Sequence, residues 1–282
     1  MRDSGRIRQR LIDCLASSIS GDAGVCTARS DDMDSVVATS PFVLSVAGII
    51  LFQASGMDSI LDLIIDKINS LYSCREIYNF YGDDTYHYDV DTTASTHTFL
   101  KLTNRDRDQK EKLVEDILDI QDDESGAIWT WFDREPNRID WFVNYNVHSY
   151  LTLIGCENNN LRNYLTENMN SFIRSGSHYY RDLDFPLFLI MIHRHLHGNS
   201  FAERIYSRSL RKPKSPSKSD ILSIALKHFF HQKKEGVNPE EMIDRIRKVW
   251  KKDTVYFTSS SAVYTSRFLN AAIALFLIDK LG

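Results

Sequence analysis

Two carboxylates and two hydroxyls stand close together in the sequence, at Asp89, Asp91, Thr92 and Thr93. They come directly before an apolar stripe with helical spacing. At such a place Asp, Ser and Thr side chains commonly cap a helix by accepting hydrogen bonds from its first free N–H groups. Two carboxylates exceed what a cap requires, and they would repel each other unless one kept its proton. A carboxylic acid that stays neutral can act as a general acid, so this stretch is either a helix cap or a proton donor.

The elements that would position these side chains are helices. Apolar residues return at intervals of three and four along almost the whole sequence, and few stretches alternate as a strand does. We therefore expect an all-α protein. Start and stop signals place helices at Ile7–Ser20, Pro41–Ala54, Met57–Leu71, Thr92–Thr103, Arg107–Ile120, Trp141–Ile154, Asn159–Arg174, Phe185–Leu196, Ser200–Arg211, Lys218–His231, Pro239–Lys251 and Ala262–Lys280.

Apolar and charged helices alternate along this series. The second, SPFVLSVAGIILF, is apolar on most sides, whereas the fifth, RDQKEKLVEDILDI, carries a charged face. A helix that is apolar all round is buried, and one with a charged face lies outside. Six inner helices alternating with six outer ones, at a repeat of about 35–50 residues, predict helical hairpins closed into a ring. The expected fold is an α/α toroid, with residues 1–282 forming a single domain.

Such a ring would bring the beginnings of its inner helices together around one central cavity, with their positive dipole ends facing it. Aromatic side chains are frequent near these beginnings. The candidates for lining the cavity are Trp129, Trp131, Phe132, Trp141, Tyr179, Tyr180 and Tyr264. Asn144 and Asn146 stand two residues apart, so they cannot share one face of a helix, and we expect Asn144 to address the cavity.

The formal net charge of −4 is unevenly distributed. Acidic residues dominate from Asp83 to Asp140, whereas Lys and Arg dominate from Arg204 to Lys252. The basic part is suited to attracting an anionic ligand such as a diphosphate. Within it, the linker Arg211–Ser219 combines Pro, Ser and Lys without apolar anchors, so we expect a mobile loop at residues 211–219.

The cysteines stand far apart without a C-x-x-C pair, which favours neither a structural zinc site nor a disulfide framework. The amphipathic N-terminus lacks the apolar core of a secretory signal. The longest apolar runs are also shorter than the roughly 18–20 residues that span a bilayer. We expect a cytoplasmic protein whose partner is a small molecule and not nucleic acid. Peripheral contact with a membrane and the oligomeric state are left open.

The D-V-D-T-T run at residues 89–93 resembles the D-x-D-D or D-x-D-T-T signature of class II terpenoid cyclases. These are the squalene–hopene cyclase-like and drimane-type enzymes, which are built on α/α toroids. The segment that follows Trp129 and the paired Tyr179 and Tyr180 are similar to the wider superfamily of terpenoid cyclases and protein prenyltransferases. Thr92 departs from the common signature, as in the drimane-type variant. The chain supplies one toroid, whereas many diterpene cyclases carry two or three helical domains.

The resemblance implies an enzyme that protonates an alkene of a linear isoprenoid and cyclises it through a carbocation. The substrate class is a prenyl diphosphate or a prenylated aromatic. Asp91 would be the proton donor, kept neutral by a cavity of low dielectric and by the nearby charge of Asp89. Aromatic faces would shield the carbocation and stabilise it, each by about 1–2 kcal/mol.

The same resemblance leaves supporting roles for other residues. Thr92 and Thr93 would take over the capping that the carboxylates otherwise provide, and Asn144 would face the reacting end of the cavity. His87, His97 and His148 are candidates for polarising or reprotonating the acid, and the sequence does not choose among them. Protonation requires no cofactor and no metal site is expected, although Mg²⁺ is left open for a diphosphate substrate.

Several rival readings use the same residues. A class I terpene synthase would need a complete metal-binding acid cluster, and a protein prenyltransferase would need an Asp/Cys/His zinc site, and neither is evident. An α/α-barrel glycosidase would pair Asp89 or Asp91 with another carboxylate across an open polar groove. A non-catalytic toroid that only binds would lack an enclosed cavity and would expose both acids as simple caps.

Overall fold

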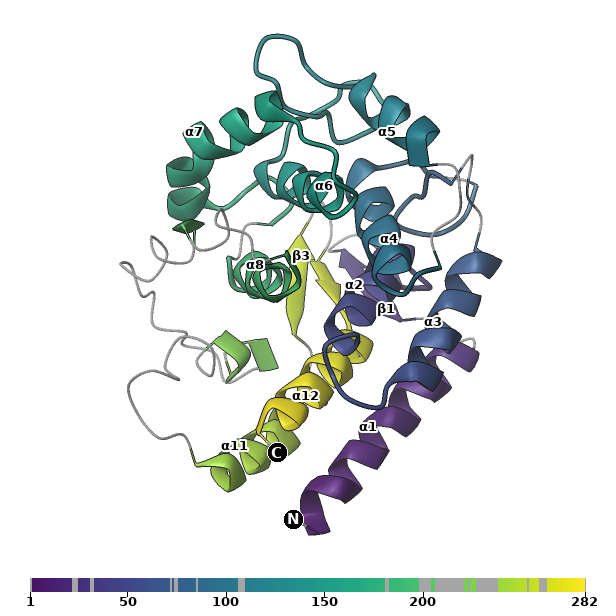
Figure 1. Cartoon of the computed structure of the whole chain (residues 1–282). Helices are drawn as coiled ribbons and strands as arrows, with labels where there is room; N and C mark the ends of the chain where they lie inside the picture. Colours follow the sequence, from purple (N-terminus) through teal and green to yellow (C-terminus); the bar gives the residue numbers. More distant parts are fainter. Residues whose placement is uncertain are drawn as a thin grey trace.

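The computed structural model describes residues 2–21, 25–30, 33–71, 73, 76–84, 86–105, 110–180, 183–197, 204–205, 221–222, 224–226, 238–252, 254–258 and 263–281. Helices make up most of this part of the chain, and they are arranged as an inner and an outer layer (Figure 1). The prediction of an α/α toroid is confirmed.

The inner helices pack side by side in chain order. α2 packs against α4, α4 against α6 and α6 against α8, while α12 returns from the C-terminal end to pack against α2. Every residue of α2 is buried, as its apolar sequence predicts. The close approach of α2 to α4 requires Gly48, because a Cβ atom there would overlap the ring of Phe99. The inner helices are α2 (Pro41–Leu51), α4 (Val90–Leu102), α6 (Trp141–Leu153), α8 (Asp184–His197) and α12 (Arg267–Leu281).

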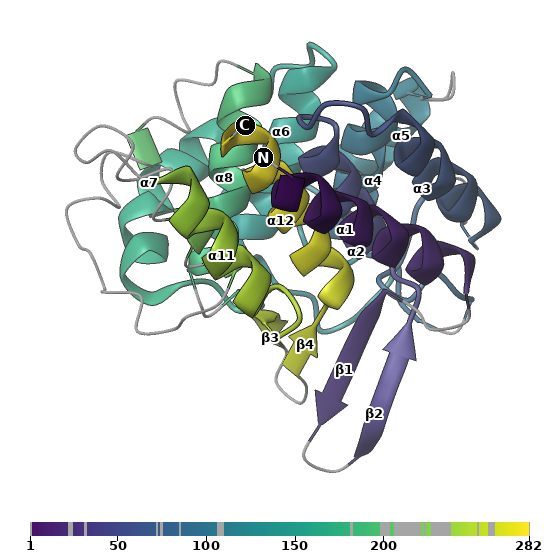
Figure 2. The ribbon, with the colours of Figure 1, turned by 90° about the horizontal axis from the view of Figure 1, so that it is seen from below.

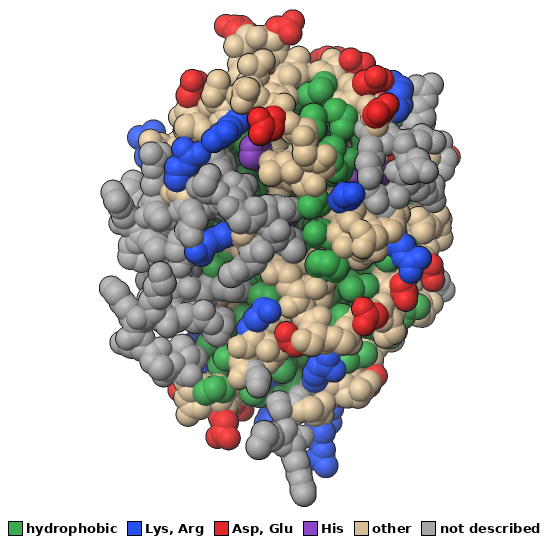
Figure 3. Space-filling view, viewed as in Figure 1, with side chains coloured by type: hydrophobic (Ala, Val, Ile, Leu, Met, Phe, Trp, Pro, Cys, Tyr) green, Lys and Arg blue, Asp and Glu red, His purple; other side chains and the backbone are tan. Residues whose placement is uncertain are grey.

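The outer helices each turn one apolar face inward. α7 buries Leu161, Leu165, Met169 and Phe172, which recur at helical spacing, while charged and polar residues occupy its other faces. The outer layer surrounds the inner one in Figure 1, and the described charges on the face drawn in Figure 3 are scattered over it and form no single patch. The outer helices are α1 (Arg2–Ser20), α3 (Asp58–Ser70), α5 (Lys110–Leu118), α7 (Asn159–Ser175) and α11 (Pro239–Val249).

Short polar side chains start the inner helices. Ser40 caps α2, Asp89 caps α4, Asp140 caps α6, and the Ser266 hydroxyl accepts from the third residue of α12. Each accepts a hydrogen bond from a backbone N–H of the first turn, which the helix itself leaves unsatisfied. Residues from the beginnings of α2, α4 and α6 line one common cavity, so the predicted convergence of helix N-termini is confirmed for these three helices.

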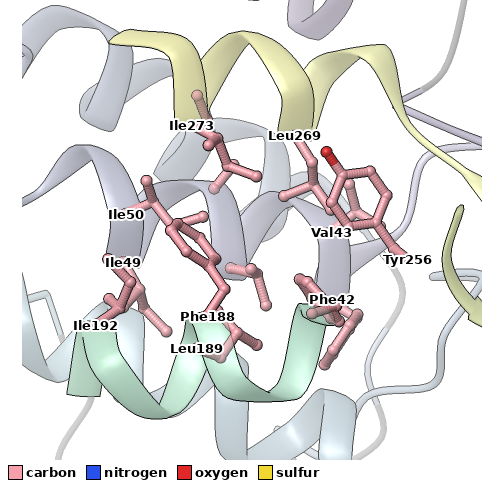
Figure 4. Close-up of a cluster of buried hydrophobic side chains, with 14 of the residues drawn as sticks. Phe42, Val43, Ile49, Ile50, Phe188, Leu189, Ile192, Tyr256, Leu269 and Ile273 are labelled. Carbon is pink, nitrogen blue, oxygen red and sulfur yellow. The ribbon is translucent and has the colours of Figure 1, made fainter. Parts of the chain in front are cut away.

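Below this cavity the axis of the ring is filled with apolar side chains (Figure 4). Phe188 of α8 lies against Ile50 of α2, Ile192 lies beside Ile49, and Ile273 faces them from α12, all of them buried. These residues lie at least one turn beyond the starts of their helices. The toroid is therefore open at the N-terminal end of its inner helices and closed by close packing further along.

A small antiparallel sheet, which was not predicted, pairs strands that follow α1 with strands that precede α12 (Figure 2). Its strands follow the order β2-β1-β4-β3, and β1 pairs with β4 through Ala28 and Tyr264. The helix expected at Ala262–Lys280 begins only at Arg267, because Val-Tyr-Thr before it favours a strand. The strands are β1 (Cys26–Ser30), β2 (Met33–Ala38), β3 (Val255–Thr258) and β4 (Val263–Thr265).

Several predictions fall on other parts of the chain. The helix expected at Ser200–Arg211 and the loop at Arg211–Ser219 lie mainly or wholly outside the described residues. Of the helix expected at Lys218–His231, residues 221–222 and 224–226 are described, and they are helical and buried. None of the described helices combines the length and the hydropathy that crossing a bilayer requires.

Candidate active site

A cavity of about 230 Å³ lies at the N-terminal end of the inner helices. Its wall combines two acids, a group of aromatic rings and a few basic side chains. The lining residues are Phe42, Phe80, Tyr81, Tyr86, Asp89, Asp91, Thr92, Thr130, Trp131, Arg134, Pro136, Arg138, Val143, His178, Tyr179, Tyr180 and Tyr264. The predicted site residues Asp89, Asp91, Thr92, Trp131, Tyr179, Tyr180 and Tyr264 are therefore brought together.

Asp91 lies in the first turn of α4 and is only 6% exposed. Its two oxygens accept hydrogen bonds from two side chains, one in α6 and one in the segment before α8. Asn146 of α6 donates through Nδ2 to Oδ1 at 2.6 Å, and the Tyr180 hydroxyl donates to Oδ2. Burial raises the pKa of Asp91 to about 6, while these two neutral donors limit the rise.

Asp89 is the N-cap of α4, and its Oδ1 accepts from the backbone N–H of Thr92 at 2.6 Å. The other oxygen, Oδ2, is buried and has no hydrogen-bond partner among the described residues. Burial raises the pKa of Asp89 to about 8, and the neighbouring charge of Asp91 adds to the rise. Burial thus favours the neutral form of Asp89, the reverse of the charged companion expected from the sequence.

The two threonines of the D-V-D-T-T run have different positions. Thr92 lines the cavity, whereas Thr93 accepts from the Tyr78 backbone N–H at 3.0 Å and donates to the Asp89 carbonyl at 2.8 Å. Thr93 therefore ties the segment before α4 to the helix. The expectation that the threonines replace the carboxylates as caps is wrong, because Asp89 caps the helix itself.

The amide that reaches Asp91 is Asn146 and not Asn144, so the expectation that Asn144 faces the cavity is wrong. Asn144 exchanges hydrogen bonds of 2.7 and 2.9 Å with the backbone of Ile128 and also donates to the Asp140 carbonyl. It therefore anchors the loop before α6 to the helix. Residues two apart on a helix face different sides, so only one of the two amides can face Asp91, and the rotation of α6 decides which one does.

Neither His97 nor His148 lines the cavity, and His87, the third histidine considered as a partner of the acid, does not line it either. His97 lies six residues after Asp91, on another face of α4, where its Nε2 is 2.8 Å from the Glu76 carbonyl oxygen and its ring packs near Tyr150. His148 is half-buried further along α6. The structure therefore does not bring either histidine to the cavity beside Asp91.

The predicted aromatic lining is correct in part. Trp141 is turned away from the cavity, because it stacks on Phe172 of α7 at 4.1 Å and donates to the Leu165 carbonyl. Trp129 and Phe132 are half-buried and are not among the lining residues. The lining also includes Tyr86, three residues before Asp89, and it includes Phe42, Phe80 and Tyr81, which the sequence pattern did not indicate.

Basic side chains at the cavity wall were also missed. The guanidinium of Arg134 lies over the ring of Trp131 at 5.1 Å, and Arg138 approaches the ring nitrogens of His178 at 2.9 and 3.2 Å. Neither arginine forms an ion pair with a carboxylate in the part of the chain that is described. The sequence signal was available, since both arginines follow the aromatic segment TWF within the stretch DREPNR.

No group of three or more His, Cys, Asp or Glu side chains is arranged to hold a metal ion in the described ranges. Cys14, Cys26 and Cys156 are free thiols. Among the described residues that line the cavity, the guanidiniums of Arg134 and Arg138 are suited to hold an anion.

Residues 29–153 match the family model described as the sesquiterpene cyclase astC-like C-terminal domain. The matched stretch contains both acids of the cavity and Asn146. No curated protein matches the sequence at a significant level.

Solved structures resemble almost the whole chain. The ligand-free type II terpene cyclase MstE from Scytonema has a TM-score of 0.63 at 10% identity, over 99% of this chain and 98% of that one. This chain has the fold of a type II terpene cyclase. A protein from Actinoplanes reaches a TM-score of 0.62 at 11% identity, over 99% of both chains. An MstE variant in complex with its substrate, geranylgeranyl dihydroxybenzoate, reaches 0.58 at 9% identity, over 100% of this chain and 99% of that one.

Proposed function

We propose that the protein is a class II-type terpenoid cyclase. In this proposal it protonates an alkene of a linear isoprenoid through Asp91 and guides the resulting carbocation to a cyclic product in the aromatic cavity. The family match and the fold likeness support a terpene cyclase. The choice of class II chemistry rests on one observation, the environment of Asp91.

That observation is a buried carboxyl whose hydrogen-bond partners are both neutral donors, Asn146 and Tyr180. Since each oxygen already accepts a hydrogen bond, an acidic proton occupies a lone pair that neither donor uses. On transfer, the O–H bond of Asp91 breaks, the alkene π bond forms a new C–H bond, and the charge moves to the substrate. The carboxylate left behind keeps both donors, which lowers the cost of releasing the proton.

The rest of the cavity suits the cation that forms. Trp131, Tyr179 and Tyr264 are among the rings whose faces and edges surround it. Aromatic faces attract cations and exclude water, and each contributes on the order of 1–2 kcal/mol when desolvated. The substrate finally loses a proton to a base, and Asp91 regains one before the next turnover.

The basic wall supports an anionic head group on the substrate. Arg134 and Arg138 can place a diphosphate, or the acidic group of a prenylated aromatic, at one part of the cavity while the isoprenoid tail reaches Asp91. Bidentate guanidinium contacts suit either group. The cavity of about 230 Å³ is below the usual range of about 300–1,000 Å³ for ligand pockets, which favours the shorter farnesyl chain over geranylgeranyl.

Protonation by Asp91 requires no cofactor. For a diphosphate substrate, Mg²⁺ would enter with the phosphate groups and help to hold them beside the guanidiniums. The described residues offer it no three-ligand cluster, so we expect metal to influence substrate binding more than the acid itself.

The two rival functions fit less well. A glycosidase requires an open polar groove between two carboxylates, whereas Asp89 and Asp91 lie among aromatic rings. A simple binding module would leave both acids exposed as caps, whereas they are 5% and 6% exposed.

Incubation with candidate substrates tests the proposal. The purified protein would be given farnesyl diphosphate, geranylgeranyl diphosphate and prenylated aromatics, with and without EDTA, and products identified by gas chromatography and mass spectrometry. We expect a cyclic product, its loss in Asp91→Asn, and its retention in Arg105→Ala, which removes an exposed arginine on a distant surface. Activity that survives in Asp91→Asn would refute the assignment of the acid.

A further inference from the structure

A third acid, Asp140, lies close to the site without lining the cavity. It is 1% exposed and caps α6, where its Oδ1 accepts from the N–H groups of Phe142 and Val143 at 2.9 and 3.2 Å. Its other oxygen, Oδ2, accepts from the backbone N–H of Tyr179 at 3.1 Å. Three backbone donors favour its ionised form, although burial raises its pKa.

The hydrogen bond between Asp140 and Tyr179 is linked to Asp91 through the next residue, Tyr180. Tyr180 directly follows Tyr179, and its hydroxyl donates to Asp91. The same short segment is folded back on itself, because the Tyr180 N–H donates to the Ser177 hydroxyl at 3.3 Å. Asp140 thus joins the start of α6, which carries Asn146, to the segment that carries Tyr180.

A cap alone does not require this arrangement. Ser40 and Ser266 serve α2 and α12 with a single hydroxyl each, accepting from the third residue of the helix at 3.4 and 3.0 Å. Asp89 caps α4 with one oxygen and leaves the other without a partner among the described residues. Of these four inner-helix caps, Asp140 uses both oxygens, and its second oxygen holds the segment that serves Asp91.

We propose that Asp140 is a positioning residue for the acid: by holding the backbone of Tyr179, it keeps the hydroxyl of Tyr180 on Asp91. The other donor to Asp91, Asn146, lies on the helix that Asp140 caps. The Asp140 side chain therefore holds both backbone segments that carry the donors to Asp91. The proposal rests on the proposed function only for the role of Asp91, since the contact itself can be measured without a substrate.

Asp140 affects the pKa of Asp91 in two opposite ways, through its own charge and through its hold on Tyr180. Removing Asp140 therefore tests which of the two effects is larger. The titratable groups that act on Asp91 are Asp140, Tyr180 and the neighbouring Asp89. The charge of Asp140 raises the pKa of Asp91, whereas the hydrogen bond from Tyr180 lowers it and is the larger of the two effects. If Asp140 only supplied charge, its removal would lower the pKa of Asp91. If it positions Tyr180, its removal would raise that pKa.

The experiment is a titration of Asp91 by carbon-13 NMR of the labelled carboxyl groups, with the Asp91 signal identified by its loss in Asp91→Asn. Asp140→Ser is the main variant, because serine caps two other inner helices of this chain but cannot also reach Tyr179. Asp140→Asn, which keeps an acceptor oxygen for the cap, is the second variant should the first fail to fold. Asn158→Ala, which removes the cap of the outer helix α7, is the matched control.

We expect the titration of Asp91 to move to higher pH in Asp140→Ser, and to lower pH when the same change is made in a Tyr180→Phe background. Asn158→Ala should leave it unchanged. A move to lower pH in both backgrounds, or no move in the first, would overturn the proposal. If the wild type cyclises none of the substrates offered, the proposed function fails, but the titration still decides the role of Asp140.

Discussion

Replacement of Asp89 by asparagine should make the stability of the protein much less dependent on pH. The amide has the shape of the acid, and its oxygen can still accept from the Thr92 N–H. It has no proton to lose, however, whereas the wild-type side chain is buried with its Oδ2 lacking a hydrogen-bond partner among the described residues. Burial raises the pKa of Asp89 from 3.8 to about 8 in the folded state.

The direction in which the free energy of unfolding changes with pH follows from the linkage between protonation and folding. A group whose pKa is raised by folding contributes its full stabilisation below the unfolded-state value and loses it as the pH rises through the folded-state value. For Asp89 this loss covers the range from about pH 4 to about pH 8. At about 1.4 kcal/mol per pH unit, the three units between pH 5 and pH 8 amount to a loss on the order of 4 kcal/mol. Asp89→Asn lacks this loss.

Urea unfolding followed by circular dichroism at pH 5, 7 and 9 measures the difference. We expect the free energy of unfolding of the wild type to fall relative to that of Asp89→Asn as the pH rises, with most of the change complete by pH 9. Asp58→Asn provides a matched control, because Asp58 is an exposed acid in the first turn of the outer helix α3. Parallel curves for wild type and Asp89→Asn would refute the inference that burial holds Asp89 neutral.

Further predictions concern the acid, the head group and the fold. Because Asp91 must carry its proton to react and burial raises its pKa only to about 6, kcat/KM should be constant below this pH and fall about tenfold per pH unit above it; a rate that rises with pH would contradict this. Arg134→Ala and Arg138→Ala should raise KM about tenfold or more for a prenyl diphosphate, where each loses a charge-assisted contact, but not for the corresponding uncharged alcohol; equal effects on both substrates would remove the arginines from the head-group site. Gly48→Ala should destabilise the protein by about 1–3 kcal/mol, measured by urea unfolding, because the new methyl group meets Phe99 of the neighbouring inner helix; unchanged stability would mean that α2 and α4 are not in close contact.

The helical ring was predictable because its signal is repeated. The inner helix α2 is apolar on most sides and the outer helix α7 on one, so the alternation of layers could be read there from composition and periodicity. α4 is buried although most of its residues are polar, so it was placed by its position in the series. The small sheet could not be read in this way. Strand β4 has only three residues, from Val263 to Thr265, and its pairing partner β1 lies at the other end of the chain. Three strand-favouring residues are too short a run to predict a sheet, because their pairing depends on the closure of the ring.

The site was predictable where its residues begin an inner helix. Asp89 and Asp91 were placed correctly because the N-cap fixes which turn of the helix they occupy. The choice between Asn144 and Asn146 failed because it depends on the rotation of α6 against α4, which is set by packing. Tyr81 was missed for a related reason, since it lies in a loop whose course toward the cavity is set by tertiary contacts such as the hydrogen bond between the hydroxyls of Tyr81 and Tyr264.

Running the reaction in deuterium oxide tests whether Asp91 begins it by giving a proton to the substrate. The carboxyl proton of Asp91 exchanges with the solvent, so each cyclic product should carry one deuterium at the carbon that was protonated, as detected by mass spectrometry, and Asp91→Asn should give no cyclic product. A cyclic product that forms without deuterium would contradict the account, because ionisation of a diphosphate would then have started the reaction.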